Sequence, residues 1–219
     1  ADLTFISGEI KDPRRNIPEL PDGPLVLVAN HPGMSDVTST IATIHDVTTA
    51  VKPSIYRRRW LRPLLEGARF FESSNDPLET GQVVEAGVAR IREGFRVLMF
   101  PEGTRSPEAG LHRFGRAAFE IACRANVPVV PIVISCNPVW LSKTRGIFSP
   151  PEQTPHVTLT ALAPVYPADH GFSSRRIRDV VEAHVRSRLG VTSGKAGGHW
   201  HGSDAATSAR IAAQEAHRG

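Results

Sequence analysis

Residues 25–37 read LVLVANHPGMSDV: an unbroken apolar run, then a histidine, and an aspartate five positions after that histidine. A strand buried on both faces of a sheet reads as a continuous apolar run, because neither face meets water. The stretch therefore predicts a central strand that ends just before His31. The Pro-Gly pair that follows predicts a turn, and Ser35 or Asp36 suits the cap of a following helix.

Short apolar runs alternate with segments of helical period along the rest of the chain. This alternation is typical of an α/β domain around a largely parallel sheet. We therefore predict a single domain over residues 1–190, with a mostly parallel central sheet flanked by helices. The strands are expected at residues 25–30, 48–54, 68–73, 96–100, 127–135 and 156–165, and the helices at about residues 36–46, 56–67, 76–93, 113–126 and 173–190.

The composition narrows the class of protein. The chain has 219 residues and is 40% hydrophobic, which is enough for one sizeable core. Residues 127–135, the longest strongly apolar stretch, are fewer than the ~20 that span a bilayer, and the first residues lack the pattern of a secretory signal. Cys123 and Cys136 are too few for a disulfide framework, so we expect a reducing compartment. Residues 191–219 are rich in Gly, Ser, Ala and His, which predicts a flexible tail.

His31 and Asp36 have the spacing of a catalytic base and its orienting carboxylate. A turn between them lets the Asp36 carboxylate reach one ring nitrogen of His31, which fixes the tautomer and favours the imidazolium. No G-x-S-x-G elbow supplies a nucleophile, so the proton would come from a substrate hydroxyl. The residues alone leave a second interpretation open, in which His31 only satisfies a turn and Asp36 only caps a helix.

A second loop, FPEGTRS at residues 100–106, follows another predicted strand. Its arginine suits a phosphate or carboxylate, and its backbone N–H groups suit a developing oxyanion. Gly103 permits a close approach of the backbone. Taken alone, Glu102 and Arg105 fit a structural ion pair equally well. Both loops lie at the carboxyl ends of strands, where ligands gather in such sheets.

The two loops resemble motifs of the glycerolipid acyltransferases, typified by lysophosphatidic acid acyltransferase. NHPGMSD matches N-H-x4-D, FPEGTRS matches F-P-E-G-T-R-S, and VPVVPIVI at residues 127–134 resembles the V-P-x-x-P-V block. The resemblance covers about residues 20–190. It implies an O-acyltransferase of phospholipid biosynthesis that moves an acyl group directly, without an acyl-enzyme, from an acyl-CoA or acyl-carrier-protein thioester to a lysophospholipid-like alcohol. His31 is then the general base and Asp36 its orienter.

The resemblance also assigns substrate contacts, and here the sequence departs from the family. The family's G-x-I-F-I-x-R motif corresponds to GARFFES at residues 67–73, where Ser73 replaces the arginine that helps hold glycerol phosphate. This puts lysophosphatidic acid as acceptor in doubt. Arg69 is a possible replacement, but on an extended strand it lies about 13 Å earlier. Lys52 sits where family members often carry a lysine, and it equally fits a solvent-exposed charge. The remaining substrate-binding assignments are Glu102, Gly103, Thr104 and Arg105, with Arg105 as the phosphate contact.

The resemblance implies peripheral attachment to the cytoplasmic face of a membrane. Because the chain opens on Ala rather than Met, either an upstream anchor is missing from it, or attachment relies on residues 56–62 or 139–151. Residues 56–62 interleave basic and aromatic side chains. On a helix they suit a membrane interface, CoA phosphates or an acidic carrier protein, or a solvated face with Trp60 and Leu61 turned inward.

Several other expectations follow. The net charge of +4 suits an anionic surface or acidic partner, and no nucleic-acid-binding pattern accompanies it, so we expect no nucleic-acid partner. No metal-ligand set is apparent, so we expect no metal and no bound cofactor.

Residues 114–143 are similar to the branch of the family found with aryl-polyene biosynthesis systems. Two other functions stay open: thioester hydrolysis, with water as acceptor, and lipid binding without turnover.

Overall fold

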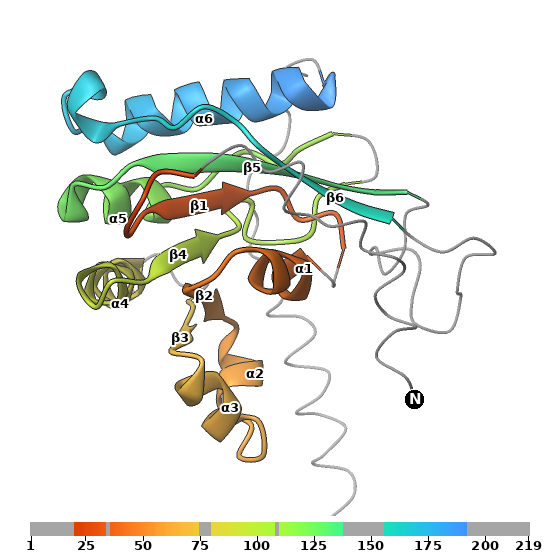
Figure 1. Ribbon diagram of the computed structural model, residues 1–219, viewed down its shortest axis with the longest axis vertical. Coiled ribbons are helices and arrows are strands. Elements are labelled where there is room, and N and C mark those ends of the chain that lie inside the picture. Colours follow the sequence, from red (N-terminus) through yellow and green to blue (C-terminus); the bar gives the residue numbers. More distant parts are fainter. Residues whose placement is uncertain (1–19, 34–35, 75–79, 108–109, 138–155, 192–219) are drawn as a thin grey trace, which may run out of the picture.

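Six strands form one sheet in the order β3-β2-β4-β1-β5-β6 (Figure 1). The computed structural model describes residues 20–33, 36–74, 80–107, 110–137 and 156–191. Neighbouring strands pair in parallel except for β5 and β6, which pair antiparallel. The predicted α/β class with a mostly parallel sheet is therefore confirmed. The strands are β1 (Val26–Ala29), β2 (Val47–Val51), β3 (Phe71–Glu72), β4 (Arg96–Met99), β5 (Val129–Asn137) and β6 (His156–Ala161).

Helices cover both faces of this sheet, as predicted. They are α1 (Asp36–Thr43), α2 (Pro53–Tyr56), α3 (Arg62–Gly67), α4 (Thr80–Arg92), α5 (Ala117–Ala125) and α6 (Ser174–Leu189), with a 3₁₀ turn at Pro167–His170. No helix in the described part of the chain is long and apolar enough to cross a bilayer. The predicted tail lies outside the described residues from position 192 onward, so the domain end near residue 190 stays a prediction.

Strand β1 is buried along its whole length, which explains its unbroken apolar sequence. Successive side chains of a strand point to opposite faces. Val26 and Val28 belong to a core cluster that includes buried residues of α4, α5 and α6. Leu27 and Ala29 belong to a second cluster on the other face, against which Ile41 of α1 packs.

The connections after β1 and β4 run to opposite faces of the sheet. The chain leaves β1 for α1 on one face, and it leaves β4 for α5 on the other, although the two strands are direct neighbours. A pair of neighbouring parallel strands whose connections diverge in this way opens a crevice at their carboxyl ends. The loops that carry His31 and Glu102 start at this point.

Two elements differ from the prediction for local reasons. The helix expected over residues 56–67 is two short helices joined by a turn, because Pro63 is tolerated only in the first turn of a helix, and α3 accordingly begins at Arg62. The strand expected over residues 68–73 shrinks to β3, because Arg69 adopts a left-handed conformation with φ of 60°.

Candidate active site

His31 and Asp36 are in direct contact. The Nδ1 atom of His31 lies 2.8 Å from Oδ2 of Asp36. An ionised carboxylate can only accept hydrogen bonds, so Nδ1 carries the proton and the lone pair of the neutral ring is on Nε2. The side chain of Asp36 is 1% exposed, whereas that of His31 is 21% exposed. The carboxylate is therefore shielded from water while the imidazole reaches the surface.

Two further contacts fix the orientation of this pair. The backbone N–H of Gly33 donates to the same Asp36 oxygen at 2.9 Å, which folds the turn between the two residues. The ring of His31 lies against that of Phe100, with centroids 4.4 Å apart. The histidine loop and the loop after β4 are thus in contact at the imidazole itself.

Asn30 extends the pairing of β1 and β5 by means of its side chain. Its amide nitrogen donates to the carbonyl of Ile134 at 2.9 Å, and its amide oxygen accepts from the N–H of Ile134 at 2.7 Å. Asn30 is buried, so both bonds are protected from water. They hold the backbone just before His31 to the centre of the sheet. The sequence analysis predicted no role for Asn30. The feature that could have indicated one is its position directly before His31 in the motif.

The carboxylate of Glu102 joins the two loops. It is buried and accepts hydrogen bonds from the backbone N–H groups of His31, at 3.3 Å, and His112, at 2.8 Å, and from the hydroxyl of Ser106. The assignment of Glu102 as a substrate contact stays a prediction, and in this structure its oxygens accept from protein donors. Its buried charge is satisfied by these donors and makes the loop geometry rigid.

Ser106 completes the link between the loops. Its N–H donates to the carbonyl of His31 at 2.8 Å, and its hydroxyl accepts from the N–H of His31 at 2.9 Å. The backbone of His31 is therefore held on both its polar groups by one residue. Ser106 is the last residue of the FPEGTRS motif, and the motif alone predicted no role for it.

The other predicted residues of the 102–105 turn lie at the same edge. Gly103 has φ of 66°, a conformation that favours glycine, and its N–H donates to the carbonyl of Phe100 at 3.1 Å. This bond engages the Gly103 N–H within the turn. Thr104 and Arg105 are half-buried and follow directly, so the turn places them beside the histidine loop.

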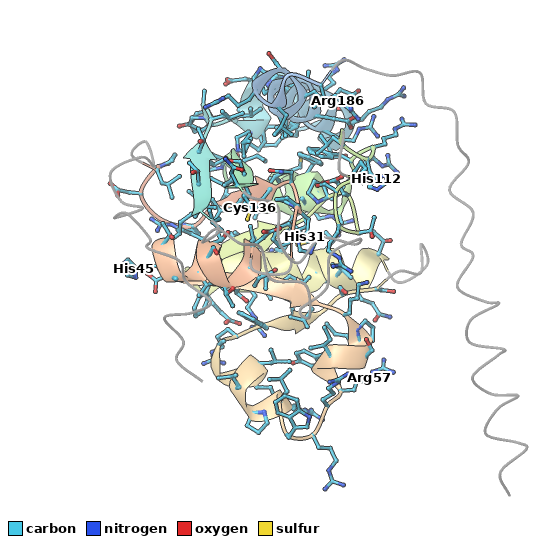
Figure 2. All side chains as sticks on the ribbon, turned by 90° about the vertical axis from the view of Figure 1, so that its right-hand side faces the viewer. His31, His45, Arg57, His112, Cys136 and Arg186 are labelled. Atoms are coloured by element: carbon cyan, nitrogen blue, oxygen red, sulfur yellow. The ribbon has the colours of Figure 1, made fainter. Side chains whose placement is uncertain are left out.

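Lys52 and Ser73 also lie at the carboxyl edge. Lys52 follows β2 and is exposed, and Ser73 follows β3 and donates its N–H to the carbonyl of Val51 at 2.7 Å. Since β2 and β1 flank β4, the loops bearing Lys52, Glu102 and His31 succeed one another along this edge. Figure 2 looks onto this edge and shows His31 near its centre.

Arg69 does not join this group, which corrects its assignment as a substrate contact. It precedes β3 and therefore lies at the amino edge of the parallel strands, opposite His31. Its carbonyl accepts hydrogen bonds from Thr48 and Arg90. Arg69 lines an open pocket of ≈ 410 Å³ with His45 and Phe95. That pocket is remote from the His31–Asp36 pair, since the length of the sheet separates them.

Other reactive groups contribute little to this site. The described residues contain no group of three or more His, Cys, Asp or Glu side chains that could hold a metal ion. Burial raises the pKa of the Cys123 thiol on α5, so it is a poor nucleophile. His112 is exposed, and only its backbone N–H takes part in the loop network.

Comparison with known proteins gives one matching family model and a set of named relatives. The family model described as Acyltransferase matches residues 11–135. The human 1-acyl-sn-glycerol-3-phosphate acyltransferase beta is 30% identical over 147 residues, which cover 64% of this chain and 51% of the relative. The 1-acyl-sn-glycerol-3-phosphate acyltransferase of Pseudomonas aeruginosa is 25% identical over 141 residues, which cover 63% and 54%. The chain thus spans about half the length of these curated relatives.

A solved structure shares the fold. It is the crystal structure of the 1-acyl-sn-glycerophosphate (LPA) acyltransferase PlsC from Thermotoga maritima, with a TM-score of 0.63 and 21% sequence identity. The match covers 83% of this chain and 72% of that one. At this identity the likeness shows the architecture alone.

Proposed function

Because the chain belongs to the acyltransferase family, whose model matches more than half of it, we propose that it catalyses O-acyl transfer. The acyl group moves from a thioester donor to the free hydroxyl of a lysophospholipid-like acceptor. The observation that carries this proposal is the pairing of the buried Asp36 carboxylate with Nδ1 of His31 at 2.8 Å. This pairing directs a basic nitrogen at the carboxyl edge, where a hydroxyl can approach.

The reaction follows from that geometry in one proton transfer and one displacement. Nε2 of His31 accepts the hydroxyl proton as the acceptor oxygen attacks the thioester carbonyl, and Asp36 stabilises the imidazolium that forms. The carbon–sulfur bond breaks, the thiolate leaves, and it takes the proton back from His31. The ester forms directly, so no serine or cysteine of the protein becomes acylated. General-base help of this kind is worth about 10²–10⁴-fold in rate.

The acceptor is proposed to bind across the loops beside His31. A phosphate or similar anion on the acceptor would meet Arg105 in the 102–105 turn and Lys52 after β2, because both loops lie at the edge that bears the base. The relatives are named for 1-acyl-sn-glycerol-3-phosphate, which supports an acceptor of that type. Ser73 in place of an arginine points to an acceptor whose anionic group is held differently from theirs.

The donor is proposed to be acyl-CoA or an acyl-carrier-protein thioester, with no bound cofactor. The reaction is placed at the cytoplasmic face of a membrane, where lysophospholipids reside. The narrower likeness to the aryl-polyene branch stays a prediction, and it depends partly on residues 138–143, which lie outside the described part of the chain.

Thiol release from a long-chain acyl-CoA tests this proposal. The 219-residue chain would be assayed with and without a panel of lysophospholipids, with an acyl-carrier-protein thioester as a second donor. We expect release that depends on a lysophospholipid and yields one diacyl product per thiol. Release that no lysophospholipid accelerates would instead indicate hydrolysis. Lysophospholipid binding without release from either donor would indicate a lipid-binding protein.

A further inference from the structure

The net positive charge of the chain is concentrated in one short segment. Residues 52–67 carry five basic side chains and one acidic side chain, a net charge of +4. The whole chain also has a net charge of +4, so the remaining residues are neutral overall. A basic segment in an otherwise balanced protein indicates a surface that meets an anionic partner.

The same segment exposes large apolar side chains. Trp60 is 75% exposed, Leu64 is 68% exposed, and Ile55 is exposed as well. The alternative in which Trp60 turns inward is therefore wrong. Within α2 and α3 only Leu65 is buried, so the segment packs little against the body of the protein. Grouped apolar side chains in water mark an interaction surface.

The arginines of this segment flank the exposed tryptophan in the sequence. Arg57 and Arg62 each pair with a glutamate, with N···O distances of 2.7 Å. Within the described residues, Arg58 and Arg59 form no ion pair. These two charges adjoin Trp60 in the turn between α2 and α3. An anionic partner would therefore meet both uncompensated charge and apolar area at one place.

The segment begins at the edge of the sheet that carries the candidate site. Figure 1 shows α2 and α3 extending beyond β3, far from α6. Helix α2 begins just after β2, at the edge that carries the histidine loop. In Figure 2, which looks onto this edge, Arg57 is seen below His31.

We propose that the α2–α3 surface, defined as Ile55, Arg57, Arg58, Arg59, Trp60 and Leu64, docks on a bilayer that contains anionic phospholipid. The arginines meet the headgroups, and the tryptophan and leucine enter the interface between headgroups and acyl chains. The docking would hold the edge of the sheet that bears His31 near a lipid acceptor. This purpose of the docking rests on the proposed function. The docking itself does not depend on catalysis.

The combination of side chains favours a bilayer over other anionic partners. Tryptophan and arginine together are typical of segments that lie in a membrane interface. There the apolar part of each side chain faces the acyl chains, and its polar part stays among the hydrated headgroups. An acidic carrier protein would also pair with the arginines, but the exposed Trp60 and Leu64 add an apolar area that suits the boundary between headgroups and acyl chains. The nucleotide of CoA calls for donors that converge on a pocket, whereas this surface projects into solvent (Figure 1).

Sedimentation with vesicles tests the docking. The whole chain would be mixed with vesicles of phosphatidylcholine, alone or with phosphatidylglycerol, at low and high salt. We expect the parent protein to bind the anionic vesicles and to dissociate as salt rises. Arg58→Gln with Arg59→Gln should lower the partition coefficient about 25-fold, at about fivefold for each charge. Trp60→Ser with Leu64→Ser should lower it about tenfold or more.

The start of helix α6 and the turn before it offer matched controls on the far side of the molecule. Phe172 is an exposed aromatic residue, and Arg175 and Arg176 are adjacent exposed arginines. Phe172→Ser and the pair Arg175→Gln with Arg176→Gln should leave vesicle binding unchanged. Absence of parent binding, equal binding by all variants, or an equal loss in the controls would overturn the proposal. So would an arginine variant that loses binding to an acyl-carrier protein while its vesicle binding is unchanged.

An activity assay separates this inference from the proposed function. With a short-chain lysophospholipid that stays monomeric in water, Trp60→Ser with Leu64→Ser should match the parent rate. With the acceptor embedded in vesicles, the same variant should be slower. Vesicle binding without any acyl transfer would contradict only the proposed function. Acyl transfer by a parent protein that binds no vesicles would contradict only the docking surface.

Discussion

The proton on Nδ1 of His31 depends on a single oxygen of Asp36. In Asp36→Asn, the amide group can donate to Nδ1 and so favours the tautomer with the proton on Nε2. That tautomer has no lone pair where the acceptor hydroxyl approaches. We expect the acceptor-dependent rate constant, kcat, to fall about 10²–10⁴-fold. Steady-state thiol release measures it, with thermal unfolding as the control for folding, and a folded Asp36→Asn with the parent rate would contradict the orienting role.

The prediction for Asn30 concerns stability, because its side chain forms hydrogen bonds to strand β5 of the sheet rather than to a substrate. Asn30→Ala leaves the N–H and carbonyl of Ile134 without their buried partners, and each unsatisfied group costs about 1–3 kcal/mol. We expect the free energy of unfolding to fall by about that amount or more, measured by urea denaturation. Asn137→Ala, at the exposed end of β5, is the matched control and should change little. Equal effects of the two substitutions would refute the bracing role.

At the level of single residues, the sequence was enough to predict the contact between His31 and Asp36, because that contact depends on a local spacing of five positions. It was not enough for Asn30 or Glu102. Asn30 bonds a strand 104 positions away, and the Glu102 carboxylate turns inward only because the two loops lie side by side. Such roles depend on the packing of distant segments, which residue types and spacing do not specify.

The two loops act as one element because of Ser106. In Ser106→Ala the N–H of His31 loses its shorter bond, and the Glu102 carboxylate loses a donor. We expect kcat to fall about tenfold, equivalent to about 1.4 kcal/mol of transition-state stabilisation, while the Michaelis constant for the donor changes little. Ser106→Thr retains the hydroxyl and should restore most of the rate. An alanine variant as active as the threonine variant would contradict the link between the loops.

Helices α4 and α5 meet where α4 carries a glycine. A Cβ atom on Gly87 would lie 2.4 Å from Cδ1 and 2.9 Å from Cγ1 of the Ile121 side chain. Gly87→Ala should therefore lower the free energy of unfolding by about 1–3 kcal/mol through overpacking, and Ile121→Val, which removes the nearest atom, should recover part of that loss. Urea denaturation measures both.

Gly81 is the matched control for this contact, because it is an exposed glycine of the same helix. A Cβ atom added to Gly81 would meet no atom within 4 Å apart from its chain neighbours and the backbone of its own helix. Gly81→Ala should stabilise the protein by about 0.4–1 kcal/mol, since alanine restricts the unfolded chain and favours the helix. If both alanine substitutions stabilise the protein, the close approach of the two helices would be refuted.

For the helices and strands, apolar runs and helical periods predicted the longer elements to within a few residues. Their failures were at residues 56–67 and 68–73, where local chemistry overrides periodicity. Pro63 forces a new helix start, and the left-handed Arg69 delays the strand. The proline was visible in the sequence, but the conformation of Arg69 was not, because arginine rarely adopts positive φ.

For the whole molecule, alternation of strands and helices predicted the α/β class and the edge of the sheet where the site lies. It did not give the strand order, which decides that β4 separates β1 from β2. That order places the Lys52 and Glu102 loops beside the histidine loop. Arg69 lies at the opposite edge because of strand direction, since residues before a parallel strand and residues after it are separated by the length of the sheet.

Whether His31 is the base of an acyl transfer is decided by the activity of His31→Ala. The measurement is the initial rate of diacyl product formation, followed by mass spectrometry with a saturating thioester donor and the preferred lysophospholipid. His31 is partly exposed, so the variant should fold, and the thermal unfolding midpoint checks this. We predict a loss of at least about 10²-fold in kcat. A folded variant that forms product at the parent rate would contradict the assignment of His31 as the base.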